Sequence, residues 1–296
     1  VPGCIANGID EKTANKIYDE MTDFAKYAFN KSHAAAYAVV SYQTAWLKYY
    51  YPVEYMAALM TSVIDNPGKV AEYIYSCRQM GIKILPPDIN HGYSNFSVDN
   101  GSIRYGLAAI KSIGRPVIKE IVAERKANGE FKNLKDFIER MSGKDINKRT
   151  IENFIKSGAF DELGGTRKQF MVIYVQILDQ VNREKKNSMT GQMSLFDIVG
   201  EEQKSEFDIP LPNVGEYEKS TKLAFEKEVL GIYLSGHPME EYEEQWRKGI
   251  SKTTQDFQFD EELGFSRVSD GATEIIGGII ASKTIKYTKN NKTMCF

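Results

Sequence analysis

The sequence has few of the residues that build disulfide frameworks or zinc sites. Its 296 residues include only three cysteines and three histidines. Cys4, Cys77 and Cys295 lie far apart and form no CxxC pair. An odd number of distant cysteines argues against a disulfide-rich secreted domain and is typical of a reducing compartment. Neither a P-loop nor a Rossmann glycine pattern is present, which argues against those two nucleotide-binding folds.

Long hydrophobic runs are also missing. The longest run without a charged residue, Ala34 to Leu47, contains polar residues and is too short to span a bilayer. We therefore expect a cytoplasmic protein with no membrane partner. Because the chain begins Val-Pro-Gly and stops at Phe296 within an apolar pattern, we also expect both ends to be cuts in a longer protein.

Charge is almost balanced over the whole chain, at -2, but it is unevenly distributed. Between Arg104 and Lys168 there are 15 Lys and Arg against 9 Asp and Glu. Between Asp197 and Glu262 there are 7 Lys and Arg against 17 Asp and Glu. We expect the basic middle of the chain alone to hold any polyanion.

Periodicity predicts a mainly α, multi-domain protein. Asp10 is a plausible N-cap for an amphipathic helix, and a second helix is expected from Ser32 to Tyr50. This second helix is apolar nearly all round, so we expect other helices to bury it. Asn100-Gly101, between alternating segments from Asn95 to Tyr105, predicts a small β-hairpin.

Polar residues gather at the start of this second helix. Asn30, Lys31, Ser32 and His33 lie where a helix N-terminus offers free N–H groups to a phosphate. The same four residues also fit an ordinary surface, with Ser32 as the cap, Lys31 solvated and His33 satisfied.

The stretches around these residues resemble a known family. Phe29 to Lys48 is similar, almost residue for residue, to the fingers of the bacterial DNA polymerase III alpha subunit, a replicative polymerase. Met80 to Asn90 resembles the segment that closes the same region. This resemblance implies that the cluster from Asn30 to His33 helps to bind an incoming deoxynucleoside triphosphate.

A second constellation suits phosphate binding through the backbone. Leu107 to Lys126 resembles a helix-hairpin-helix motif, two short helices joined by a turn at Ile113-Gly114. A glycine after a buried isoleucine would let the backbone turn tightly and aim its N–H groups at one phosphate oxygen. Ser112 stands where the motif prefers a second glycine. The residues expected to bind DNA here are Lys111, Ser112, Ile113, Gly114 and Arg115.

A partner unit follows from Ile146 to Phe160. Its expected DNA-binding residues are Lys148, Arg149, Lys156, Ser157 and Gly158. Each unit alone could be an ordinary αα-turn with solvated charges. Two tandem units within the basic segment favour binding of duplex DNA through its phosphates, independently of base sequence.

A third motif lies in a polar linker. Gln192, Leu195 and Phe196 offer an amide and two large apolar anchors that could fill a pocket on a partner. The form Gln-x-x-Leu-Phe resembles the internal motif by which bacterial polymerases bind the sliding clamp, the beta subunit. Alternatively, this hydrophobic segment folds back on its own domain.

The resemblance covers nearly the whole chain and implies five parts. They are distal helical fingers (1–92), a tandem helix-hairpin-helix domain (93–181), a linker with the clamp-binding motif (182–210), a helical connector (211–268) and the truncated start of an OB-type barrel (269–296). The connector contains Gly231 to Pro238, another stretch similar to the family, in which we expect His237 to be a turn residue.

Catalytic carboxylates are missing from the chain. Replicative polymerases hold two metal ions with clustered carboxylates, and no Asp-x-Asp occurs here. The resemblance implies that Mg²⁺ binds in the full-length enzyme and that this chain supplies no catalytic residue, metal ligand or cofactor site. It implies as partners primer-template duplex DNA, a deoxynucleoside triphosphate, the sliding clamp and other subunits of the replicase holoenzyme.

Two other classes of protein compete with this interpretation. A non-enzymatic helix-hairpin-helix adaptor could bind DNA and dock on the sliding clamp, but it would have no need of the fingers-like stretch. A helical interaction scaffold would bind no nucleic acid, and it predicts no duplex affinity even at low salt.

We expect the isolated chain to have no polymerase activity, because it lacks the carboxylates that hold the metal ions. The test is incubation of the purified chain with primer-template, deoxynucleoside triphosphates and magnesium. Any primer extension above a no-protein control would contradict the prediction.

Overall fold

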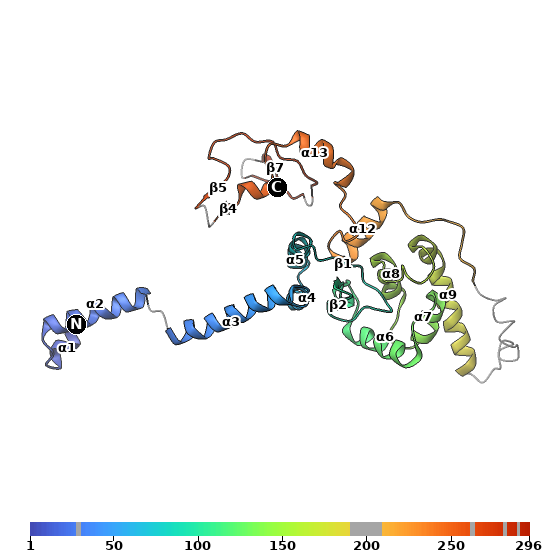
Figure 1. Ribbon diagram of the computed structural model, residues 1–296, viewed down its shortest axis with the longest axis horizontal. Helices are drawn as coiled ribbons and strands as arrows, with labels where there is room; N and C mark the ends of the chain where they lie inside the picture. Colours follow the sequence, from blue (N-terminus) through green and yellow to red (C-terminus); the bar gives the residue numbers. More distant parts are fainter. Residues whose placement is uncertain (28–30, 190–208, 261–263, 281–282, 289–290) are drawn as a thin grey trace. The chain divides into compact units, whose positions relative to one another are not determined.

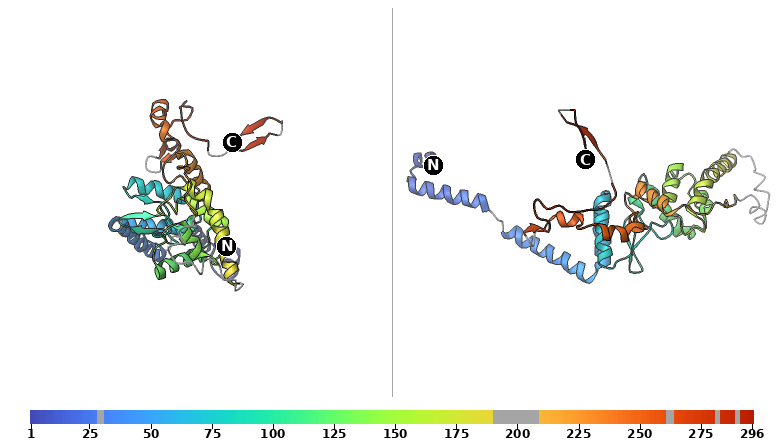
Figure 2. Two further views of the ribbon diagram at one scale, coloured as in Figure 1. Left: turned by 90° about the vertical axis from the view of Figure 1, so that its right-hand side faces the viewer. Right: turned by 90° about the horizontal axis from the view of Figure 1, so that it is seen from above.

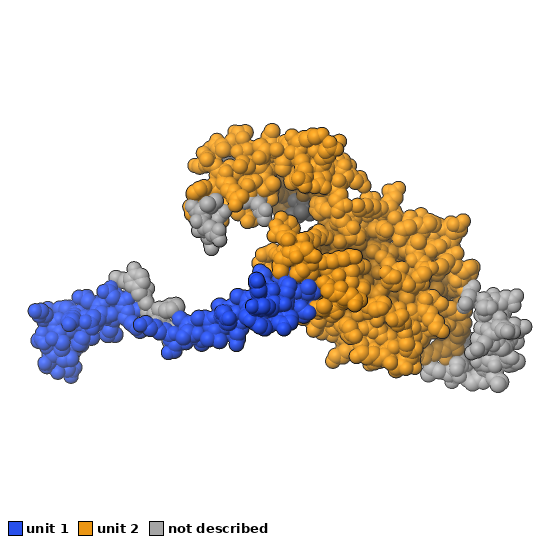
Figure 3. Space-filling model, in the orientation of Figure 1, with its two compact units in different colours: residues 1–59 blue, residues 60–296 orange. Residues whose placement is uncertain are grey.

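A computed structural model describes residues 1–27, 31–189, 209–260, 264–280, 283–288 and 291–296 (Figure 1). The chain divides into two compact units, residues 1–59 and 60–296, which Figure 3 colours separately. Most described residues with regular structure are helical, and the described strands form small sheets of two or three strands. The predicted mainly α, multi-domain class is confirmed.

The first unit is helical. Its elements are α1 (Pro2–Ala6), α2 (Glu11–Tyr27), α3 (Lys31–Tyr50) and the start of α4 (Pro52–Ser62). The Asp10 carboxylate accepts a hydrogen bond from the Thr13 N–H at 3.0 Å, as expected of an N-cap. The expectation that other helices bury α3 is wrong for the described residues, because none of the side chains of α3 is buried among them.

The second unit contains the remaining elements. They are α5 (Pro67–Gln79), β1 (Ile84–Leu85), β2 (Ser97–Asp99), β3 (Ser102–Arg104), η1 (Leu107–Ala109), α6 (Arg115–Asn128), α7 (Leu134–Met141), α8 (Lys148–Ser157), α9 (Arg167–Met189), α12 (Lys219–Leu230), η3 (Glu240–Tyr242), α13 (Glu243–Gly249), η4 (Thr254–Phe257), β4 (Phe259–Asp260), β5 (Phe265–Ser266), β6 (Ile285–Tyr287) and β7 (Thr293–Cys295).

A three-stranded sheet with the order β1-β3-β2 precedes the helical core. The predicted hairpin is present, with Val98 opposite Ile103 in antiparallel register. Asn100 and Gly101 both have positive φ, as a tight two-residue hairpin turn requires. In addition, β1 pairs in parallel with β3. This sheet crosses the domain boundary expected at residue 92, because β1 lies before that boundary and β3 after it.

Four phenylalanines form the centre of the helical core, where helices α6 to α9 gather (green to yellow in Figure 2). Phe137 lies edge-on against Phe131, Phe154 and Phe160, with ring centroids 5.0, 6.1 and 4.9 Å apart. All four side chains are almost fully buried. Edge-to-face packing adds to the hydrophobic gain and fixes the angles at which the helices meet.

Helix α12 lies within the acidic part of the chain and packs against α8. Leu223, Val229 and Leu230 supply its apolar contacts, and Glu226 is also buried, with 1% of its surface exposed. A buried carboxylate is costly unless cations and N–H groups satisfy it. The surroundings of Glu226 meet this requirement.

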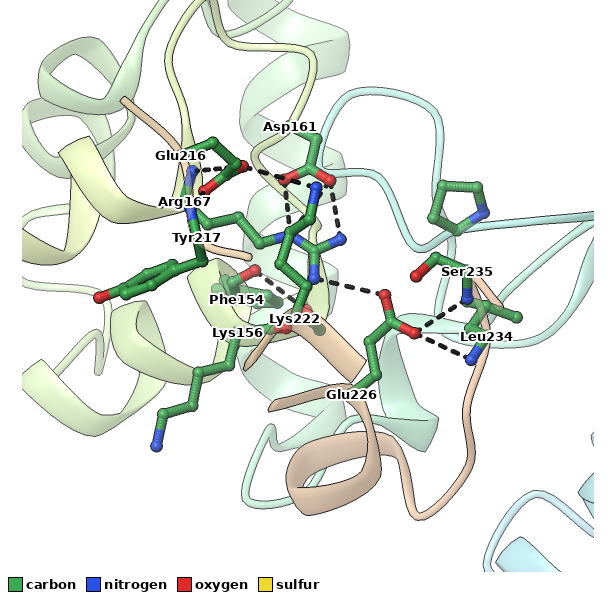
Figure 4. Close-up of polar contacts among 12 residues, drawn as sticks. Phe154, Lys156, Asp161, Arg167, Glu216, Tyr217, Lys222, Glu226, Leu234 and Ser235 are labelled. Carbon is green, nitrogen blue, oxygen red and sulfur yellow. Dashed lines mark hydrogen bonds and ion pairs between the residues drawn. The ribbon is translucent and has the colours of Figure 1, made fainter. Parts of the chain in front are cut away.

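Figure 4 shows these surroundings. Glu226 pairs with the Arg167 guanidinium at 3.3 Å and accepts hydrogen bonds from the N–H groups of Leu234 and Ser235 at 2.9 Å each. Arg167 also pairs with Asp161 at 2.8 Å and donates to the Lys156 carbonyl. One buried carboxylate therefore joins the start of α9, helix α12 and the segment that follows α12.

That following segment is the one that resembled the family around His237. Gly231 ends α12 in the left-handed conformation. The ring Nδ1 of His237 accepts a hydrogen bond from the Met239 N–H at 3.1 Å, which agrees with the expected turn residue. In the predicted barrel segment the described residues form one two-stranded sheet, β6 with β7. The assignment of an OB-type barrel stays a prediction.

No helix in the described parts of the chain is both long and apolar enough to cross a lipid bilayer.

Replacement of the buried carboxylate tests its importance for stability. Glu226→Ala should lower the free energy of unfolding by about 3–5 kcal/mol, because it leaves the Arg167 charge partly unpaired in the interior. Urea denaturation measures this change. The matched control is Glu243→Ala, which breaks the exposed pair with Arg247 and should cost less than about 1 kcal/mol. Equal losses in the two variants would contradict the assignment.

Candidate nucleic-acid interface

Residues of both predicted hairpins line one cleft of about 700 Å³. Five predicted DNA-binding residues line it, namely Lys111, Ser112, Lys148, Arg149 and Lys156. They come from the turn before α6 and from α8, two segments about 40 residues apart in sequence. The other lining residues are Glu152, Asn153, Glu228 and Val229. Four cations against two carboxylates give the cleft a positive balance.

The turn of the first hairpin differs from the predicted one. Its first helix is only the single 3-10 turn η1. Ser112, and not Gly114, has the left-handed backbone, with φ of 63°. Gly114 has φ of -76°. The left-handed position explains why the motif prefers glycine where this chain has Ser112, because a side chain disfavours that conformation.

Gly114 has a different role in the structure. It is the N-cap of α6, and no side chain caps this end of the helix. A Cβ at Gly114 would come no closer than 3.6 Å to Pro116, so the glycine relieves no clash. The uncapped helix start leaves N–H groups and positive potential for an anion. Ile113 is buried and holds the turn in the core, so it does not contact a ligand through its side chain.

Arg115 and Lys111 differ in their surroundings. Both side chains are exposed. Arg115 donates to the Asn95 side chain at 3.2 Å. The Lys111 ammonium has no hydrogen bond or ion pair to any residue that the structure describes.

The second hairpin begins α8 with two exposed cations. The Asn147 side chain accepts the Thr150 N–H at 3.0 Å and thereby caps the helix, so its N-terminus is less open than that of α6. Lys148 pairs with Asp179 at 3.2 Å. The Arg149 guanidinium makes no hydrogen bond or ion pair within the described parts of the chain. This hairpin therefore offers side-chain cations more than backbone amides.

The loop before α8 is itself fastened to α6. Lys144 pairs with Glu124 at 2.6 Å. Hydrogen bonds from Lys144 and Asn128 lower the pKa of Glu124 to about 2. A depressed carboxylate pKa means that this contact is present at neutral pH and is lost only as pH falls from the ordinary value, 4.5, toward 2.

Lys156 is the least accessible cation of the cleft, with 13% of its side chain exposed. It pairs with Glu152 and with Glu228 of α12, both at 2.8 Å. Burial alone would lower the pKa of Lys156, but hydrogen bonds to the two carboxylates more than offset this and raise it. Lys156 is therefore charged, and two carboxylates already neutralise it before any anion enters.

The predicted phosphate corner at Ser157 and Gly158 is wrong, because both residues are buried. Ser157 donates its hydroxyl to the Phe154 carbonyl at 3.0 Å. Gly158 ends α8 in the left-handed conformation, and the Arg167 guanidinium covers its Cα. The Arg167 guanidinium packs against the Ser157–Gly158 corner, so this corner presents no N–H group to a ligand.

Sequence reasoning missed the two residues that hold the first turn in place. The Asn153 side chain donates to the Lys111 carbonyl at 2.7 Å, and the Lys111 N–H donates to the Val229 carbonyl at 2.8 Å. Asn153 lies on the same face of α8 as Arg149 and Lys156, so its spacing gave no sign that it is buried. The Val229 contact uses a backbone carbonyl of α12, which no side-chain pattern reveals.

The predicted nucleotide-binding residues lie elsewhere, in the first unit. Lys31 begins α3, so Ser32 is inside the helix and is not its N-cap. The His33 ring lies 4.4 Å from the Tyr37 ring, centroid to centroid. Asn30 is outside the described residues, and so are the predicted clamp-binding residues Gln192, Leu195 and Phe196.

A metal site needs several His, Cys, Asp or Glu side chains held close together. In the ranges that the structure describes, no group of three or more His, Cys, Asp or Glu side chains is arranged to hold a metal ion. The Mg²⁺ expected for a full-length polymerase therefore has no candidate ligand cluster there.

Comparison with known proteins agrees with this geometry. A family model described as the helix-hairpin-helix motif matches residues 81–170. The chain is 42% identical over 250 residues to the DNA polymerase III subunit alpha of Vibrio cholerae, an alignment that covers 84% of this chain and 22% of that protein. The corresponding protein of Borreliella burgdorferi is 37% identical over 294 residues, 99% of this chain and 25% of the relative.

The subunit alpha of Escherichia coli K12 is 43% identical over 241 residues, 81% of this chain and 21% of the relative. The chain thus spans about a quarter, or slightly less, of the length of these relatives. The similarity extends over most of the chain, including the stretches that resembled the fingers and the paired hairpins. The chain belongs to the DNA polymerase III alpha subunit family.

Proposed function

We propose that this chain holds duplex DNA in the cleft between the Ser112 turn and α8, as part of the DNA-directed DNA polymerase that replicates the bacterial chromosome. One observation carries the proposal: Lys111 and Arg149, from two separate hairpins, line the same cleft, and neither the Lys111 ammonium nor the Arg149 guanidinium has a polar partner among the described residues. Membership of a polymerase family favours this function over that of a non-enzymatic adaptor.

The chemistry of the cleft suits the phosphate backbone more than the bases. Its ligand groups are the cations of Lys111, Lys148 and Arg149. The uncapped start of α6 at Gly114 follows Ser112 by two residues in sequence. Such groups neutralise phosphates and release counterions, so binding depends steeply on salt and little on sequence. We therefore propose that the bound nucleic acid is the primer-template product, whose sequence changes with every cycle of synthesis.

The other activities of the intact enzyme are also proposals for this chain. In that enzyme the primer 3′-hydroxyl would attack the α-phosphate of a deoxynucleoside triphosphate and release pyrophosphate, with Mg²⁺ held outside the described residues. Lys31, Ser32 and His33 would contribute to nucleotide binding, together with Asn30. Its further partners would be the other subunits of the replicase holoenzyme. Its location would be the cytoplasm.

We further propose that Gln192, Leu195 and Phe196 bind the sliding clamp. The motif lies between α9 and α12, which both pack against α8, the helix that carries most of the cleft cations. A clamp bound to this segment would be tethered by the chain close to the duplex in the cleft.

Removal of the two unpaired cations tests duplex binding. Lys111→Ala with Arg149→Ala should weaken binding by roughly tenfold at low salt, equally for unrelated sequences, because charged hydrogen bonds to phosphate are lost. Fluorescence anisotropy at several salt concentrations should also give a salt slope smaller by about 1 for each lost contact. Lys69→Ala, on the exposed Lys69–Glu72 pair of α5, is the control and should change neither quantity. A loss confined to one DNA sequence would exclude binding through phosphates alone.

Clamp binding has a separate test. Leu195→Ala with Phe196→Ala should abolish binding to a purified bacterial sliding clamp, because the two apolar anchors are removed. Duplex affinity should stay unchanged, while the variant lacking Lys111 and Arg149 should keep its clamp binding. Clamp binding that survives loss of both anchors would show that the segment serves another purpose.

A further inference from the structure

The turn that carries Lys111 and Ser112 needs support from outside itself. Ser112 adopts the left-handed conformation, which is unfavourable for a non-glycine residue. The turn is short, from Ile110 to Gly114, and the side chains of Lys111 and Ser112 are exposed. The tertiary structure must therefore hold the backbone of this turn if its groups are to meet a phosphate reproducibly.

Both backbone polar groups of Lys111 supply this support. Its N–H donates to the Val229 carbonyl at the end of α12, and its carbonyl accepts the Asn153 amide of α8. At 2.8 and 2.7 Å, both are short hydrogen bonds. The residue directly before the left-handed position is thus held on two sides.

Asn153 lies between two cations of the cleft. It follows Arg149 by four residues and precedes Lys156 by three, which places all three side chains on one face of α8. All three line the cleft. Asn153 is 7% exposed, so an unpaired amide there would be costly, whereas an apolar side chain could have filled the space. The Asn153 amide is satisfied by the hydrogen bond that it donates to the Lys111 carbonyl.

We propose that Asn153 is a positioning residue for duplex binding. It holds the turn of the first hairpin against α8, so that Lys111 and Arg149 contact phosphates of one and the same duplex. This inference rests on the proposed function. Asn153 acts through Lys111 and has no contact of its own with DNA.

The test combines Asn153→Leu with loss of each cation, using the whole 296-residue chain and a duplex of arbitrary sequence. Asn153→Leu should weaken binding by roughly the factor that Lys111→Ala produces and lower the salt slope by about the same amount. In the Asn153→Leu chain, Lys111→Ala should then have almost no further effect, because Lys111 is no longer positioned. Arg149→Ala should keep its full effect, since Arg149 belongs to α8 itself.

A matched control separates positioning from general stability. The Asn90 amide donates to the Phe131 carbonyl at 2.9 Å, a comparable bond from a side chain to a distant backbone carbonyl outside the cleft. Asn90→Leu should lower the melting temperature but leave the effect of Lys111→Ala intact. If Asn153→Leu does not fold, Asn153→Asp keeps the shape, removes the donor and is judged by the same comparison.

The outcomes distinguish the two proposals. If Lys111→Ala weakens binding as much in the Asn153→Leu chain as in the unaltered chain, the positioning role is overturned and the proposed function stands. Equal shrinkage of the Lys111 and Arg149 effects would show a merely structural role and would also overturn it. If the unaltered chain has no salt-dependent affinity for duplex DNA, the proposed function itself fails.

Discussion

The buried carboxylate of Glu226 is the contact on which the arrangement of the cleft depends. It pairs with Arg167 at the start of α9 and accepts two backbone N–H groups from the segment after α12. These bonds fix α12 to the start of α9 and to the segment after α12, and three residues later the Val229 carbonyl accepts the Lys111 N–H. If α12 were not held in this position, the turn of the first hairpin would lose the Val229 bond and keep only the Asn153 bond.

The two hairpins offer different groups to a phosphate backbone. The first presents the uncapped N-terminus of α6, with an exposed left-handed turn before it. The second has a capped helix and presents Lys148 and Arg149 instead. Backbone amides fix the position of a phosphate oxygen, while flexible cations adapt to the duplex and supply long-range attraction. The combination fits the proposed binding of duplex DNA of any sequence.

The acidic part of the chain contributes to the lining of the cleft, which its negative charge had not led us to expect. Glu228 of α12 lines the cleft and pairs with Lys156, as does Glu152 of α8. All four cleft cations still lie in the basic middle of the chain, so the expectation that this segment alone holds a polyanion stays a prediction. These two carboxylates reduce the positive charge at the inner end of the cleft and leave Lys111 and Arg149 as its unpaired cations.

Local patterns were sufficient where a feature depends on neighbours in sequence. They predicted the N-cap at Asp10, the helix from Ser32 to Tyr50 and the Asn100-Gly101 turn. The same reasoning failed at Ser157 and Gly158, where a small residue before a glycine suggested an open corner. That glycine instead ends a helix and accommodates Arg167, a residue whose place depends on α9 and α12.

Local patterns alone established the mainly α class, the small hairpin, the basic segment and the family resemblance, because periodicity, turn chemistry and charge are local properties. The fold was needed to show that the two hairpins share one cleft, that Ser112 takes the left-handed position, and that Asn153 and Val229 hold Lys111. These contacts join residues 42 or more positions apart, one of them through a backbone carbonyl. Every residue has a backbone carbonyl, so the residue type at a position does not indicate which hydrogen bond its carbonyl will accept.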